Sequence, residues 1–220
     1  MENKKTMKET EQSYNIIFNR PETMTFVLLL IALIGASLLS EFFLDINYIL
    51  RSFTLTAELS IAALVLTMVI ISGEIDLSAA ANIALSACVF AYVQASGVPI
   101  VGAIIVGLFA GFVMGALNAI LVIIYQLPSI IVTIGTLIFY RGLAQVIAGD
   151  KSIRVPEWFI GINTKMILGV PFPVVIFTMI AIILGLILGT TIYGRQIYQI
   201  GTNNTAALHA GIKSDRIKFG

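Results

Sequence analysis

The sequence predicts an all-α fold, a polytopic membrane helix bundle with about six transmembrane helices. Hydrophobic residues make up 58% of its 220 residues and charged residues only 11%, and the mean hydropathy is +0.99. These values lie well outside the range of soluble domains. The charges gather near the two ends and leave uncharged tracts of about 20 residues, the length that crosses about 30 Å of hydrocarbon. We expect these tracts to be helices, because a helix satisfies its own backbone hydrogen bonds in lipid.

Six apolar tracts set the predicted topology. Six spans return the chain to its starting side, so the two polar end segments, 1–23 and 195–220, share one side of the membrane around a transmembrane domain over 24–194. Of the 13 basic residues, eight lie in the end segments, and the positive-inside rule assigns these segments to the cytoplasm. The eight are Lys4, Lys5, Lys8, Arg20, Arg195, Lys213, Arg216 and Lys218. The predicted spans are 24–40, 53–71, 77–96, 100–125, 129–148 and 171–193.

Cysteine and histidine usage excludes several kinds of site. The chain has one cysteine, Cys88, and one histidine, His209, so it can form neither an internal disulfide nor a cysteine and histidine metal centre. The predicted topology also places the two on different sides of the bundle. A nucleophile paired with a base, as an intramembrane hydrolase needs, is therefore not expected.

The segment from Ser72 to Ser78 interrupts an apolar run with Gly73, Glu74 and Asp76. A carboxylate is costly in hydrocarbon and usually serves a pathway or a partner, so Glu74, Asp76 and Ser78 are candidate pathway residues. The alternative is structural. Asp76 or Ser78 can cap the third span, since a side-chain oxygen there accepts hydrogen bonds from free N–H groups.

Small and polar residues mark the fourth and fifth spans. Glycines recur at every fourth residue through Gly107, Gly111 and Gly115, a stripe along which two helices can approach closely. Inward hydroxyls and amides can line a path for a polyhydroxylated solute, or they can hydrogen-bond between helices. Arg141 is expected either to extend to the outer surface or to form a salt bridge within the bundle. The candidate lining residues are Asn82, Asn118, Thr133, Thr136 and Arg141.

The segment from Gly201 to Lys218 is polar and helix-competent, and it follows the last apolar tract. We predict a helix over 201–215 that binds a soluble partner at the membrane edge. Asn203, Asn204 or Thr205 can cap its start, and Gly211 can end the helical body. The alternative is a helix on anionic headgroups, for which the glycine, asparagine and alanine content leaves a weak apolar face.

Three motifs carry a resemblance to a known family. The terminal segment reads Gly-x-Asn-x-x-Ala-Ala-x-x-x-Gly-Ile from Gly201 to Ile212, and the helix break resembles Gly-Gly-Ile-Asp-Leu-Ser with Glu74 at the second glycine. The stretch from Pro128 to Gly142 resembles Pro-x-x-Ile-x-Thr-Leu-Gly-Thr followed by Arg-Gly. With these motifs the chain resembles bacterial ABC-importer permeases for sugars, the ribose, xylose and galactose group that includes rhamnose and autoinducer-2 permeases.

The resemblance implies a permease subunit in a bacterial inner membrane. In this family two permease subunits form the path, an external binding protein delivers a sugar-like solute, and two cytoplasmic ATPases supply the energy. The chain would bind no cofactor and catalyse nothing alone, because ATP is used by the partner. Since such permeases continue through further helices, we expect this chain to be the N-terminal part of a longer one. The alternative function is an ion-coupled secondary transporter or channel, because charged helix breaks also mark such carriers. The resemblance assigns ATPase coupling to Gly201, Asn203, Ala206, Ala207, Gly211 and Ile212.

Overall fold

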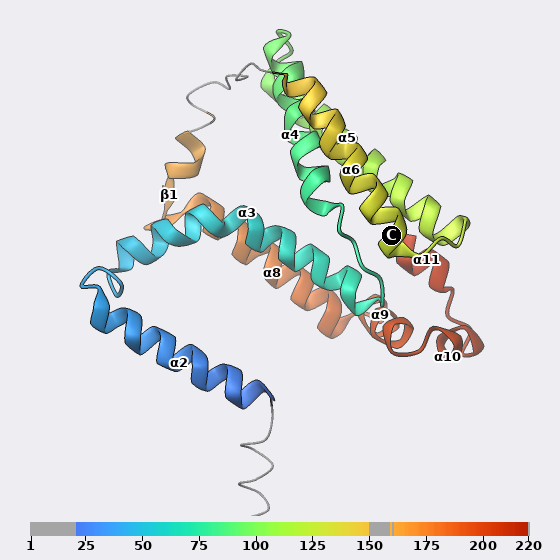
Figure 1. Cartoon of the computed structure of the whole chain (residues 1–220), viewed down its shortest axis with the longest axis horizontal. Helices are drawn as coiled ribbons and strands as arrows, with labels where there is room; N and C mark the ends of the chain where they lie inside the picture. The colour runs from blue at the N-terminus through green and yellow to red at the C-terminus, as the bar shows by residue number, and fades with distance from the viewer. Residues whose placement is uncertain (1–20, 150–158, 160, 220) are drawn as a thin grey trace, which may run out of the picture. The chain divides into compact units, whose positions relative to one another are not determined.

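The computed structural model describes residues 21–149, 159 and 161–219, and its chain divides into two compact units, 1–53 and 54–220. Most of the described structure is helical (Figure 1). Residues 1–20, which are most of the predicted N-terminal segment 1–23, lie outside the described residues, as do residues 150–158 and 160 between the predicted spans 129–148 and 171–193. The elements are α2 (Pro21–Leu39), α3 (Ile46–Ile71), α4 (Ala79–Ala95), α5 (Ile100–Ala119), η1 (Ile120–Ile124), α6 (Ser129–Ala148), η2 (Gly161–Thr164), β1 (Met166–Ile167), β2 (Val170–Pro171), α8 (Phe172–Thr190), α9 (Ile192–Thr202), α10 (Asn204–His209) and α11 (Ser214–Phe219).

Every predicted span is a helix, which confirms the all-α, polytopic fold class. Four described helices are long and apolar enough to cross a bilayer, and two further apolar helices are shorter, Thr23–Leu39 and Ala79–Ala95. The bounds of α6 coincide with the predicted span 129–148, because proline and glycine punctuate both ends. The start of α3 lies earlier than the predicted residue 53, since Asp45 Oδ1 accepts the backbone N–H groups of Asn47 and Tyr48 and caps the helix there.

Helices α4, α5 and α6 form the packed core of the second unit and lie side by side (Figure 1). Leu85, Met114 and Tyr140, one from each helix, are buried together, and Tyr140 is only 1% exposed. Only part of the glycine stripe lies in close contact with α4. A Cβ at Gly107 would lie 2.9 Å from the Cβ of Phe90, whereas a Cβ at Gly115 would meet nothing within 4 Å. Small residues therefore permit close contact between α5 and α4 over the first part of the stripe.

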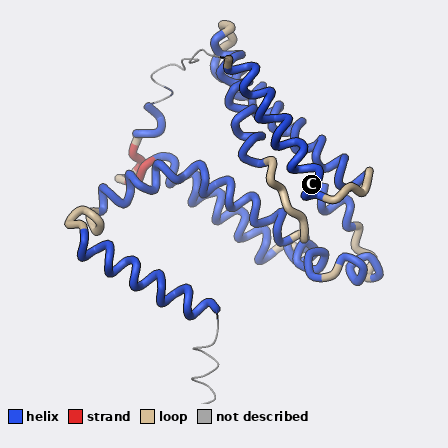
Figure 2. Tube along the Cα trace, in the orientation of Figure 1, coloured by secondary structure: helices blue, strands red, loops and turns tan. Residues whose placement is uncertain are grey.

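Loops and short elements connect the long helices. Strands β1 and β2 pair antiparallel around Leu168 and Gly169, which both have positive φ, as a two-residue hairpin turn requires. Residues 72–78 form the loop between α3 and α4, seen as a tan segment in Figure 2. Helix α8 ends at Thr190, before the predicted residue 193, because the Thr191 hydroxyl accepts the Gly194 N–H and starts α9.

Candidate functional site

The loop between α3 and α4 places Asp76 beside Ser78. Asp76 Oδ1 accepts hydrogen bonds from the backbone N–H of Ser78 at 2.8 Å and from its hydroxyl at 2.7 Å. Ser78 occupies the N-cap position of α4, but its side chain makes no capping hydrogen bond. The capping alternative is therefore wrong for the Ser78 side chain, whose hydroxyl is engaged in tertiary contacts. Asp76 instead forms a local turn with Ser78 just before the helix.

A buried hydrogen-bond chain extends from this turn through α5 to α6. Asn118 Nδ2 donates to Ser78 Oγ at 2.7 Å, and the Tyr140 hydroxyl donates to Asn118 Oδ1 at 3.3 Å. The same hydroxyl lies 3.0 Å from the carbonyl oxygen of Met114. Ser78 is fully buried and Asn118 is 7% exposed. A buried polar network with satisfied partners fixes one arrangement of its helices, because an unpaired buried polar group is costly.

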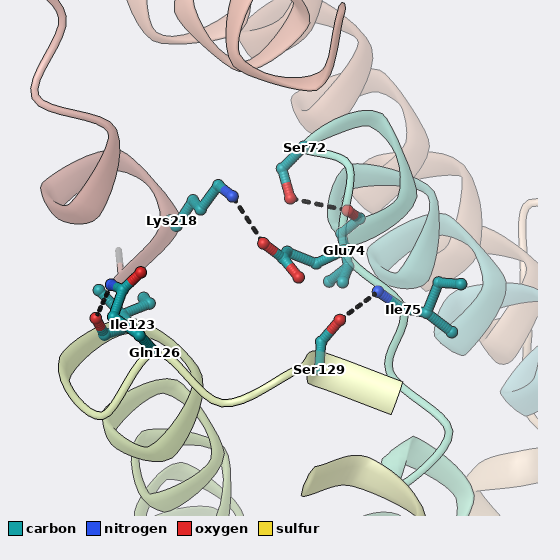
Figure 3. A network of polar contacts seen from close by, with 8 residues as sticks. Ser72, Glu74, Ile75, Ile123, Gln126, Ser129 and Lys218 are labelled. Carbon is teal, nitrogen blue, oxygen red and sulfur yellow. Dashed lines mark hydrogen bonds and ion pairs between the residues drawn. The ribbon is translucent and has the colours of Figure 1, made fainter. Parts of the chain in front are cut away.

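The start of α6 supports the backbone of the same loop, as Figure 3 shows for Ser129 and Ile75. The backbone N–H of Ile75 donates to Ser129 Oγ at 3.4 Å. Thr133 Oγ1 lies 2.8 Å from the Ser129 carbonyl of its own helix and 3.3 Å from the Ile75 carbonyl, so its hydroxyl is shared between the two acceptors. Irregular backbone at membrane depth is tolerated where protein groups satisfy it. Two hydroxyls of α6 therefore let the chain leave helical geometry between α3 and α4.

The Glu74 side chain pairs with Lys218 at the end of α11, whereas the neighbouring Ile75 contacts α6 (Figure 3). Glu74 Oε1 is 2.6 Å from Nζ of Lys218, a residue 144 positions later in the chain. The exposed fractions are 15% for the Lys218 side chain and 25% for that of Glu74, so the pair is largely shielded from solvent. Such shielding makes an ion pair stronger than one on an open surface.

These groups surround a cavity of about 350 Å³, within the size range of small-ligand sites. Of the predicted pathway residues, Glu74, Asp76, Asn118 and Thr133 line it. Tyr193 of α9 also lines it and donates its hydroxyl to the Ile217 carbonyl at 3.0 Å. Burial raises the pKa of Tyr193 above its ordinary value of 10.0, so this hydroxyl remains a donor at neutral pH.

The remaining pathway candidates lie elsewhere. Asn82 Nδ2 donates to the Gly111 carbonyl at 3.2 Å, so this amide joins α4 to α5. Thr136 is buried, and its hydroxyl bonds within its own helix. Arg141 is exposed, and among the described residues the one ion pair is that of Glu74 and Lys218, so the predicted salt bridge of Arg141 within the bundle is not formed there. In the same described part, no three histidine, cysteine, aspartate or glutamate residues gather to hold a metal ion.

The polar terminal segment folds as separate short helices, so the prediction of one helix over 201–215 is wrong. Asn203 is extended, with φ −159°, and it ends α9 and begins α10. Its Oδ1 accepts the N–H of Ala206 at 3.0 Å, which confirms the predicted asparagine cap. Gly211 adopts φ +83° just after α10, a left-handed geometry that glycine adopts without strain and that ends the helix as predicted.

A groove of about 420 Å³ lies in the corner between α9 and α10. Four residues assigned to ATPase coupling line it: Asn203, Ala206, Ala207 and Ile212. Ala207 is 4% exposed and packs within the segment, whereas Ala206 is exposed. Leu208, 53% exposed on α10, is an apolar side chain available to a partner.

Gly201 joins this segment to the loop between α3 and α4. A Cβ at Gly201 would overlap the carbonyl oxygen of Ile71 and would lie 3.4 Å from the backbone nitrogen of Gly73. Gly73 itself has φ +85°, which favours glycine. The resemblance implies a coupling role for Gly201, and the structure places its backbone against the end of α3.

Tyr140, Tyr193 and Lys218 are site residues that the sequence did not single out. Tyr140 directly precedes Arg141, and its burial and hydroxyl contacts are tertiary. Lys218 was read only as one of several basic residues near the end of the chain. A lysine in a short polar segment gives no local indication of a carboxylate partner 144 residues earlier.

Comparisons with known proteins cover both the helical core and the terminal segment. Residues 48–220 match the family model described as branched-chain amino acid transport system / permease component. The autoinducer 2 import system permease protein LsrD of Escherichia coli (strain K12) is 32% identical over 196 residues, which are 86% of this chain and 59% of that protein. LsrD of Shigella flexneri has the same values. LsrD of Enterobacter sp. (strain 638) is 31% identical over 205 residues, 90% of this chain and 63% of that protein.

The chain thus spans about 59% of the length of the LsrD protein of Escherichia coli K12. No solved structure matches it. The family match includes the helix break, the buried Ser78 and Asn118 contact, and the corner of α9 and α10. The chain therefore belongs to the family described as branched-chain amino acid transport system / permease component.

Proposed function

We propose that the chain is a transmembrane permease subunit of an ATP-driven importer and that it forms part of the path for a sugar or sugar-like solute. The observation that carries this proposal is the exposed corner of α9 and α10, held by Gly201 against the end of α3. A short helix that is exposed on one side and anchored to a membrane helix on the other is suited to receive a soluble partner. A cytoplasmic ATPase is the partner that the family of the chain requires.

The polar cavity supports a pathway role for the loop between α3 and α4. Carboxylates of Glu74 and Asp76, the Asn118 amide and the Thr133 hydroxyl line it. These groups offer donors and acceptors that replace water around a polyhydroxylated solute. The relatives are named as permeases of autoinducer 2 import.

The proposed orientation puts α9, α10 and α11 in the cytoplasm. An apolar helix reverses the side of the chain at each crossing, and five spans after α2 bring residues 72–78, 125–128 and 191–219 to the same side. The structure supports this arrangement, since Ile75 contacts Ser129 and Glu74 contacts Lys218. Arg195, Lys213 and Arg216 on that side agree with the positive-inside rule.

In this proposal ATP is bound and hydrolysed by the partner subunit, and the chain itself carries no cofactor. A second permease subunit, identical or related, would complete the path, and an external solute-binding protein would deliver the solute. The membrane is the bacterial inner membrane. The chain contributes through a change of conformation, because it links closure of the ATPase to the side of the membrane on which the path is open.

Uptake into vesicles separates this function from an ion-coupled carrier. The transporter, reconstituted with its ATPase and binding protein, is supplied with internal or external ATP as its orientation requires, while ionophores collapse the proton and sodium gradients. Sustained uptake that needs ATP supports the proposal. Uptake that depends on the ion gradients and does not change with ATP would establish the carrier function instead.

A further inference from the structure

The structure joins the terminal segment to the loop between α3 and α4 at two points that differ in chemistry. One is the backbone contact of Gly201 with Ile71, at the end of α3, and with Gly73 of the loop. The other is the ion pair between Lys218 and Glu74, with 2.6 Å between Nζ and Oε1. The first holds the end of α9, and the second holds the end of α11, so both ends of the corner that carries α10 are attached to the same loop.

The loop is in turn bonded to all three core helices. One residue after Glu74, the backbone of Ile75 bonds to Ser129 and Thr133 of α6. Two residues after Glu74, the Asp76 carboxylate holds Ser78 at the start of α4, and Ser78 accepts the Asn118 amide of α5. A displacement of Glu74 therefore acts within two residues on contacts to α4, α5 and α6.

The ion pair suits a link that forms and breaks. Each side chain keeps some solvent contact, with 15% exposure for Lys218 and 25% for Glu74, so neither charge is stranded when the two separate. A fully buried pair would resist separation, because its partners would be left unpaired in low dielectric. An open surface pair would transmit little, because water and salt screen it.

We propose that Lys218 and Glu74 are positioning residues that transmit movement of the terminal segment to the polar cavity and its hydrogen-bond chain. This inference rests on the proposed function, because it assumes that a partner moves the segment. Lys218 acts through Glu74 on Asp76 and Ser78, and Lys218 and Glu74 both line the cavity. Gly201 supplies the fixed contact and the ion pair supplies the one that changes during transport.

A charge-swap experiment on the reconstituted transporter tests the assignment. Lys218→Glu and Glu74→Lys each put like charges together, so we expect solute uptake to fall about tenfold per ATP hydrolysed, within the usual range of coupling effects. ATPase binding should persist, because the corner of α9 and α10 is unchanged. The double swap restores opposite charges and should recover uptake to within a few fold of wild type.

Lys213→Glu is the matched control. Lys213 is an exposed lysine of the same segment, so its reversal changes the net charge equally without touching the pair. Its uptake per ATP should remain that of wild type. Glu74→Gln removes the charge but keeps the volume of the side chain. If this variant also loses uptake per ATP hydrolysed, misfolding caused by a reversed charge cannot explain the loss.

Cross-linking measures the contact without any transport assay. Glu74→Cys and Lys218→Cys in a Cys88→Ala background should be joined by a short bifunctional thiol reagent in membranes, whereas Glu74→Cys with Lys213→Cys should react far less. Normal uptake per ATP in Lys218→Glu, or a double swap that stays as defective as the single variants, would overturn the assignment. If wild type fails to import with ATP while the cross-link forms, the proposed function fails and the contact stands.

Discussion

Asn118 of α5 donates a 2.7 Å hydrogen bond to the hydroxyl of Ser78, forty residues earlier in the chain. Both side chains are buried, and Asp76 and Tyr140 complete their hydrogen bonding. The contact joins the N-cap residue of α4 to the last turn of α5, next to the cavity. The hydrogen bond therefore fixes the loop before α4 against α5. The polar residues of the loop are visible in the sequence, whereas its pairing with α5 is not.

Replacing Asn118 by leucine should destabilise the folded protein by about 1–2 kcal/mol, because Ser78 and Tyr140 each lose a buried partner. Denaturant titration in detergent, followed by near-ultraviolet circular dichroism, measures the change. Ser96→Ala is the control, since its hydroxyl bonds only to Tyr92 of its own helix and is exposed. Equal midpoints for the two variants would contradict a structural role for the Asn118 amide.

Gly107→Ala should weaken packing of α5 on α4, whereas Gly115→Ala should leave it unchanged. A Cβ at Gly107 would lie 2.9 Å from the Phe90 Cβ and 3.2 Å from the Ser86 carbonyl oxygen, but a Cβ at Gly115 meets open space. Overpacking of this kind costs about 1–3 kcal/mol. Melting temperatures in detergent should fall by several degrees for Gly107→Ala alone, and a matching fall for Gly115→Ala would be evidence against this register.

Gly201→Ala should separate α9 from the end of α3, because the added Cβ would overlap the Ile71 carbonyl. The expected result is loss of ATP-driven uptake by about tenfold or more, within the range of coupling effects, with the protein still inserted in the membrane. Gly189→Ala in α8 is the control, since nothing lies within 4 Å of its Cβ position. Normal uptake in Gly201→Ala would show that this close contact does not matter for transport.

Asp76→Cys should react with a small, membrane-impermeant thiol reagent that reaches the cavity, because Asp76 lines it. In the same Cys88→Ala background, Ile138→Cys on α6 should react poorly with that reagent and well with a lipid-soluble one, since Ile138 is 67% exposed on an apolar helix. A carboxylate facing lipid would cost about 2.5–3.5 kcal/mol. Labelling of position 76 only by the lipid-soluble reagent would place Asp76 outside the aqueous path.

Local signals were sufficient to predict the helices and their breaks. Hydropathy identified all six apolar tracts, including the bounds of α6, and the polar run at Ser72 to Ser78 identified the loop before α4. The asparagine cap of α10 was also predictable, because capping depends on neighbours three residues away. These features depend on interactions within a few residues.

Tertiary pairing was not predictable from the same signals. The contacts of Asn118 with Ser78 and of Lys218 with Glu74 join residues 40 and 144 positions apart, and nothing local specifies such partners. The sequence predicted Arg141 as a site residue because it is a charge in an apolar span. In the structure Arg141 is exposed, and its neighbour Tyr140 is the buried member of the hydrogen-bond network. The single helix over 201–215 was wrong because Asn203 separates α9 from α10, and Gly211, with φ +83°, separates α10 from α11.

In the proposed function the corner of α9 and α10 receives the ATPase, and this claim is tested by the affinity of purified ATPase for vesicles that contain the transporter. Ala206→Trp fills the groove from an exposed position, and Ala95→Trp adds the same bulk at the exposed end of α4. We predict that Ala206→Trp weakens ATPase binding at least about tenfold, the effect of losing about 1.4 kcal/mol of binding free energy, while Ala95→Trp binds as wild type does. Equal ATPase affinity for wild type and Ala206→Trp would contradict the claim.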